Sequence, residues 1–111
     1  MPEITYSDFD NIEMRIGRIL AVEDFPKARK PAFKLTIDFG EHGIKRSSAQ
    51  ITTLYTKEEL VGRQIIAVTN FPPRQIADFL SEVLVLGTVN PNGDVVLLAP
   101  DRDSPLGQRI S

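Results

Sequence analysis

The sequence predicts an all-β fold in a single domain that spans residues 1–111. Short stretches of alternating apolar and polar residues recur along the chain, with the period of half-buried strands. Clusters of Gly, Pro, Asn and Asp, such as GEHG and NPNGD, separate these stretches and mark turns. Only one interior segment carries both start and stop signals for a helix, and that segment is short.

The N-terminal segment predicts one helical turn and then a long, bent strand. Ser7 and Asp10 have the spacing of a helix N-cap and its partner, so we expect a turn over residues 7–12. Residues 14–23, MRIGRILAVE, follow as a strand whose apolar phase changes midway. Strict alternation would keep one apolar face, and we therefore expect a bulge or bend at Gly17.

A hairpin of two further strands is expected next. Residues 33–39, FKLTIDF, place Phe33, Leu35, Ile37 and Phe39 on one face. GEHG supplies the turn, and the mostly polar residues 44–51 should have at least one face in water. A proline-bounded basic loop, DFPKARKPA, precedes this hairpin.

The single interior helix is predicted in TKEELVG, residues 56–62. Thr56 and Glu59 have the spacing of a capping box, and Gly62 is a C-terminal stop.

Two apolar strands are predicted after the helix, over Gln64–Phe71 and residues 83–89, before a last strand in VVLLA and an extended tail. Pro72 and Pro73 cannot donate hydrogen bonds to a sheet, so the first of these strands must stop there. We expect the link between the two strands to be a polar loop on a rigid scaffold, which is where binding residues tend to lie. Its polar residues are Asn70, Arg74, Gln75, Ser81 and Glu82.

Three strands, a short helix and two or three more strands are the plan of a five-stranded OB-fold barrel. The helix lies between the third and fourth strands, and terminal segments flank the barrel. Strand counting alone leaves another small all-β barrel or sandwich open.

Composition favours an ordinary globular protein, with 41% apolar and 25% charged residues. The formal net charge of −2 argues against strong overall attraction to nucleic acid. However, residues 27–46 hold six basic residues against two acidic ones, so either a local basic surface or ordinary solvated charge is expected there.

The chain has no cysteine, which fits a reducing compartment. The acidic N-terminus lacks the apolar segment of a secretory signal, and no apolar run is long enough to cross a bilayer. We therefore expect a cytoplasmic protein without membrane insertion.

Residues for catalysis and metal binding are scarce. His42 is the only histidine, it lies in a predicted turn, and neither a second histidine nor a cysteine accompanies it. Asp101 and Asp103 are separated by Arg102 and lack the glycine of a calcium loop. We expect no enzyme activity, no metal and no cofactor.

Residues 70–87, NFPPRQIADFLSEVLVLG, resemble the signature of the tRNA-binding-domain family, an OB-fold module also found at the end of some methionyl-tRNA synthetases. NIEMRIGRI, LTIDFG and YTKEELVGRQIIAV match the same family, and the resemblance extends from about Phe9 to Ile110. Residues 25–52 are most similar to the branch of small stand-alone secretion chaperones, the CsaA type.

The resemblance implies a non-catalytic homodimeric chaperone that binds unfolded presecretory polypeptides for protein export. The alternative is a tRNA-binding module that binds structured RNA or assists an aminoacyl-tRNA synthetase. A subunit that only scaffolds other proteins is a third possibility. Relatives use their flanks for dimerisation, and here Phe9, Ile12 and the tail PLGQRI are the corresponding apolar flanks.

We expect the ligand on the face of the second and third strands and on the loops after the first and fourth. The residues predicted to bind polypeptide are Ser48, Gln50, Asn70, Arg74, Phe79 and Leu80. Those predicted to bind RNA are Lys27, Arg29, Lys30, Lys34, Lys45, Arg46, Arg74 and Ser81.

Each candidate has a structural alternative. Arg74 could cap a strand end or pair with Glu82. Phe79 and Leu80, expected to be an exposed apolar contact, could instead plug the barrel or form a dimer contact. The polar candidates could satisfy local backbone groups.

Overall fold

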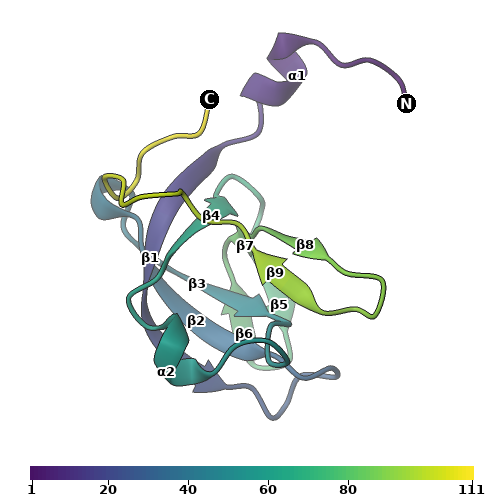
Figure 1. Cartoon of the computed structure of the whole chain (residues 1–111), viewed down its shortest axis with the longest axis vertical. Coiled ribbons are helices and arrows are strands. Elements are labelled where there is room, and N and C mark those ends of the chain that lie inside the picture. Colours follow the sequence, from purple (N-terminus) through teal and green to yellow (C-terminus); the bar gives the residue numbers. More distant parts are fainter.

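The computed structural model describes residues 1–111 and confirms the all-β OB-fold-like barrel (Figure 1). Its main sheet is antiparallel, with the strand order β3-β2-β1-β4-β7. The strands of this sheet are β1 (Met14–Asp24), β2 (Phe33–Asp38), β3 (Ile44–Ala49), β4 (Gln64–Val68) and β7 (Leu84–Val85). Two separate hairpins are formed by β5 (Arg74–Ile76) with β6 (Phe79–Ser81), and by β8 (Gly87–Val89) with β9 (Val95–Leu97). The helical elements are α1 (Tyr6–Asp10), the 3-10 turn η1 (Gly40–His42) and α2 (Lys57–Leu60).

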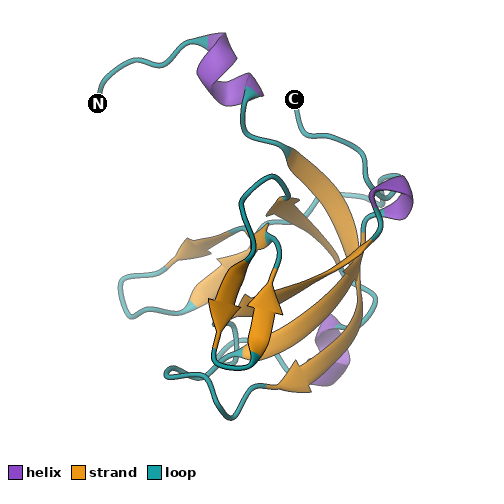
Figure 2. Ribbon diagram, turned by 180° about the vertical axis from the view of Figure 1, so that it is seen from behind, coloured by secondary structure: helices purple, strands orange, loops and turns teal.

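β1 is the longest strand, and it curves across the barrel because its two halves pair with different neighbours (Figure 2). Its first half pairs with β4, from Met14 opposite Val68 to Arg18 opposite Gln64. Its second half pairs with β2, and the register shifts between Ile19 and Ala21. The bend is therefore real, but its predicted position at Gly17 is wrong.

Gly17 serves close packing instead of the bulge. A Cβ atom at this position would lie 2.5 Å from Cγ2 of Ile37 and 2.7 Å from Cε1 of Phe39. Only a residue without a side chain lets these two core side chains reach the β1 backbone.

The core confirms the alternation predicted for the second strand. Phe33, Leu35, Ile37 and Phe39 are all buried, and Arg18–Asp24 of β1 pairs along this strand. The remaining members of the main cluster are Ile19, Ile51, Leu60, Ile65, Ala67 and Val83. Burial of such apolar area contributes about 25 cal/mol per Å² to stability.

The N-cap predicted for α2 is confirmed, whereas the N-cap predicted for α1 is wrong. Thr56 and Glu59 form the predicted capping box of α2, and Gly62 ends that segment with a φ of 91°. In α1, however, Thr5 is the N-cap, with Asp8 as its partner, and Ser7 lies inside the helix. The same three-residue spacing occurs twice, and the earlier pair starts the helix.

The second half of the chain differs from the prediction in three places. The strand expected over Gln64–Phe71 ends at Val68, because Thr69 and the side chain of Asn70 turn to bind the backbone before β1. The single strand expected over residues 83–89 is split into β7, which pairs with β4, and β8, which pairs with β9. The expected polar loop is the β5–β6 hairpin.

The C-terminal tail is extended, as predicted, and it runs along β1. Ile16 donates its N–H to the carbonyl of Gln108 at 3.0 Å and accepts from the N–H of Gly107 at 2.8 Å. The α1 segment, by contrast, projects from the barrel and buries none of its residues (Figure 1). No helix of the structure is long and apolar enough to cross a membrane.

Candidate binding site

Hydrogen bonds hold the β5–β6 hairpin against β3 at the C-terminal end of β6. Glu82 donates its N–H to the carbonyl of Arg46 at 2.8 Å, and its side chain accepts the N–H of Arg46 at 3.0 Å. The hydroxyl of Ser81 accepts the N–H of Ser48 at 3.1 Å. These bonds fix one face of the hairpin against the sheet.

Phe79 fills the space between the hairpin, the basic loop and the sheet. Its ring lies 5.4 Å from that of Phe25, and only 3% of the residue is exposed. The guanidinium of Arg46 stacks over this ring at 4.7 Å, and the ammonium of Lys34 lies 5.6 Å away. The prediction that Phe79 is an exposed contact is therefore wrong. Phe79 is buried in a small cluster with Phe25 and Ala32 that is separate from the main core, and we call it the plug of this cluster.

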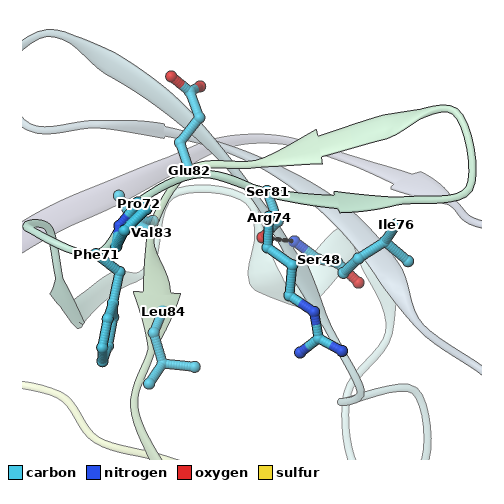
Figure 3. A pocket seen from close by; sticks show the side chains of 9 residues that line it. All are labelled: Ser48, Phe71, Pro72, Arg74, Ile76, Ser81, Glu82, Val83 and Leu84. Carbon is cyan, nitrogen blue, oxygen red and sulfur yellow. Dashed lines mark hydrogen bonds between the residues drawn. The ribbon is translucent and has the colours of Figure 1, made fainter.

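An open hollow of about 340 Å³ lies beside the hairpin, and we call it the apolar hollow (Figure 3). Phe71 and Leu84, which both line this hollow, keep 54% and 49% of their surface exposed. The residues that line it are Ser48, Phe71, Pro72, Arg74, Ile76, Ser81, Glu82, Val83 and Leu84.

A second hollow, of about 550 Å³, lies next to the first, and we call it the basic hollow. Ser48, Arg74 and Ile76 line both hollows. The other residues of the basic hollow are Lys27, Ala28, Arg29, Lys30, Ala32, Gln50 and Ala77.

The basic hollow keeps most of its positive charge unpaired. The ammonium of Lys27 lies 2.9 Å from the carboxylate of Asp78 and, by donating a hydrogen bond, lowers the pKa of that carboxyl. Arg29, Lys30 and Arg74 form no ion pair. Anionic ligands are therefore favoured at this hollow over cationic ones.

Arg74 occupies the junction of the two hollows. Its side chain extends away from that of Glu82 in Figure 3. Glu82 instead faces β3, where it accepts from Arg46 N–H and lies 4.0 Å from Lys45. The alternative that Arg74 pairs with Glu82 is therefore wrong, and its guanidinium is available to a ligand.

Only some of the residues predicted to bind polypeptide, and only some of those predicted to bind RNA, lie together around the two hollows. Of the residues predicted to bind polypeptide, Ser48, Gln50 and Arg74 line the hollows. Asn70 instead binds the backbone of Asn11 and Glu13, while Leu80 is exposed and lines neither hollow.

The predicted RNA-binding residues divide in the same way. Lys27, Arg29, Lys30 and Arg74 surround the basic hollow, and Ser81 lines the apolar one. Lys34 and Arg46 lie over the aromatic pair, and Arg46 also pairs with Glu23 at 3.0 Å.

The apolar lining of the site was not among the predicted binding residues; it consists of Phe71, Pro72, Ile76, Val83 and Leu84. The sequence pattern predicts strands at Phe71, Val83 and Leu84, and at Pro72 only the end of a strand. Their position in the sequence could have indicated them, since all of these residues lie within ten positions of Arg74.

A family model described as a putative tRNA binding domain matches residues 14–109. The crystal structure of chaperone CsaA from Bacillus anthracis is 53% identical, with a TM-score of 0.94, and the match covers 99% of this chain and 100% of that one. The CsaA chaperone protein from Picrophilus torridus is 55% identical, with a TM-score of 0.90 and coverages of 98% and 100%.

Methionine–tRNA ligase of Bdellovibrio bacteriovorus is 34% identical over 108 residues, which are 97% of this chain but 16% of the ligase. This chain therefore spans less than a fifth of the length of that curated relative.

Substitution of the plug should destabilise the fold. We expect Phe79→Ala to lower the free energy of unfolding by about 3 kcal/mol, because it removes a buried ring and leaves a cavity. Leu80→Ala, a substitution at the neighbouring exposed position, should change it by less than about 1 kcal/mol. Urea unfolding followed by circular dichroism measures both values, and equal losses would contradict the assignment of Phe79 as a plug.

Proposed function

This chain belongs to the putative tRNA binding domain family, and from this premise we propose that it is a non-catalytic, homodimeric chaperone of the CsaA type. Its ligands are unfolded segments of polypeptides destined for export, and it works in the cytoplasm. High identity to two chaperone structures over nearly the full length of each chain supports this assignment.

The apolar hollow is the observation that carries the proposal. A chaperone must cover apolar side chains of its client, and the exposed surface of Phe71 and Leu84 gains about 25 cal/mol for each Å² of apolar area that a client removes from water. Ser48 and the unpaired Arg74 border this surface and supply hydrogen-bond donors to client carbonyl groups. An apolar pocket with a few polar groups at its rim is typical of a ligand site.

Binding of tRNA is a second candidate function, and the basic hollow favours it. Arg29, Lys30 and Arg74 form no ion pair, so they are free to neutralise phosphates without breaking an internal contact. The two functions use neighbouring parts of one surface.

Dimerisation would bury the apolar N-terminal segment. Ile4, Tyr6 and Ile12 keep 69%, 73% and 44% of their surface exposed. Closed two-fold dimers are the commonest assembly of soluble proteins, and they pair the same surface of each copy. Two copies would also present two hollows to one long client, which raises avidity.

We expect sedimentation equilibrium at micromolar concentration to give twice the mass of the 12.4 kDa chain. Ile12→Asp should shift the protein toward the monomer, because it places a charge in the proposed interface. Leu54→Asp, at an exposed leucine in the turn before α2, is the matched control and should leave the dimer intact. A parent protein that sediments as a monomer would rule the dimer out.

The polypeptide function is tested at Leu84. We expect Leu84→Asp to weaken binding of a fluorescently labelled, reduced and carboxymethylated α-lactalbumin at least about tenfold, roughly 1.4 kcal/mol, because it puts a charge into the apolar hollow. Leu54→Asp, which changes a leucine of similar exposure that lines neither hollow, should bind as the parent does. Failure of the parent to bind this probe at micromolar concentration would reject the proposal.

The RNA function is tested by salt dependence. Arg74→Ala should weaken tRNA binding and reduce the slope of log K against log salt by roughly 0.7 to 0.9, the contribution of one neutralised phosphate. Arg102→Ala is the control, since Arg102 is exposed and pairs only with Asp101. Filter binding at several salt concentrations measures both slopes. An equal slope for the parent and Arg74→Ala would remove Arg74 from the RNA site.

A further inference from the structure

The outer edge of β5 is a free strand edge beside both hollows. β5 pairs with β6 on one side and with no strand on the other. Arg74 and Ile76 of this strand line the apolar and the basic hollow alike. A chain segment that pairs with the free edge of β5 would therefore lie along the two hollows.

The register of the hairpin determines which backbone groups point outward. Only Ala77 and Asp78 separate Ile76 from its partner Phe79, so these partners must exchange the hydrogen bonds that close the turn. Hydrogen-bonded and non-hydrogen-bonded pairs alternate along an antiparallel ladder. The pair of Gln75 and Leu80 is therefore non-hydrogen-bonded, and the N–H and C=O of Gln75 point away from β6.

No other part of the chain uses these two groups. No backbone bond outside the hairpin involves Gln75, and the residue is exposed. Its side-chain amide donates to the carbonyl of Ala77 at 2.9 Å and therefore lies along its own strand.

We propose that an unfolded polypeptide binds here by adding an antiparallel strand to β5, with the main chain of Gln75 as the pairing residue. This inference rests on the proposed chaperone function and names the form in which the client is held. Main-chain pairing is independent of client sequence, which suits a site for many clients.

Strand addition also predicts which client side chains enter the hollows. Side chains alternate between the two faces of a strand. The client residue opposite Gln75 shares the face of Gln75, and its two neighbours share the face of Arg74 and Ile76. Side chains two positions apart in the client therefore point toward the hollows. An apolar side chain suits the apolar hollow, and an acidic one suits the basic hollow.

The sequence before β5 keeps this edge short. Pro72 and Pro73 have no N–H to offer, and Arg74 carries a charge, both of which hinder uncontrolled pairing between sheet edges. One residue pair is thus open for strand addition, so affinity depends on this pair together with the side chains that enter the hollows.

A proline at position 75 tests the inference. Gln75→Pro removes the outward N–H, and proline is tolerated in an edge strand where that N–H faces solvent. We expect the variant to bind the labelled, carboxymethylated α-lactalbumin at least tenfold more weakly than the parent. Gln75→Ala keeps the N–H and should bind within twofold of the parent. Both variants should bind tRNA as the parent does, because RNA would be held through side-chain charges.

The outcomes separate this inference from the proposed function. Parent-like binding by Gln75→Pro, or equal losses in Gln75→Pro and Gln75→Ala, would overturn strand addition and leave the chaperone function standing. Absence of binding by the parent would overturn both.

A second measurement uses the unaltered protein, in case Gln75→Pro fails to fold. A short synthetic peptide that binds the parent is prepared with one N-methyl group at each position in turn. Strand addition predicts that affinity falls at least tenfold at the residue paired with Gln75 and changes less than twofold at its neighbours. Equal affinity at every position would overturn the inference.

Discussion

The fold depends on the backbone pairing of β1 along both of its edges. β4 and β2 pair with successive halves of this strand, and the C-terminal tail pairs with its beginning. β3 and β7 are then placed by β2 and β4. The register shift at Leu20 bends β1, whose two halves pair with β4 and β2. Gly17 lets the core side chains of Ile37 and Phe39 reach the backbone of β1. A bulge of this kind is what allows a sheet to curve into a barrel.

The sequence predicted those features of the fold for which a residue pattern is compatible with a single local structure. The alternation from Phe33 to Phe39 and the capping box of α2 were both predictable, because the period-2 pattern and the cap spacing are visible in residues that are close in sequence. The position of the bulge and the division between β7 and β8 were not, since each depends on which strand lies opposite. The site was predicted in part for the same reason: Arg74 could be recognised by its neighbours, whereas the burial of Phe79 against Phe25 is a long-range contact.

The two hollows differ in chemistry because of how the neighbouring charges are distributed. No carboxylate lines the basic hollow, and the nearby Asp78 pairs with only one of its cations, Lys27. The apolar hollow remains open because β4 ends early at Val68 and leaves Phe71 outside the sheet. Arg74 thus lies between an apolar surface and a cationic one, and a ligand that covers either surface also reaches this guanidinium.

The pairing of the tail with β1 has a consequence for the order in which the protein is made. Arg15 binds the carbonyl of Gly107, a residue 92 positions later. During synthesis β1 therefore leaves the ribosome well before the tail that pairs with its beginning. Contacts of such long separation slow folding, and the edge of β1 that the tail covers stays unpaired until the tail has been translated. The protein that we propose to bind extended segments of other chains therefore has, while it is being made, an unpaired strand edge of its own.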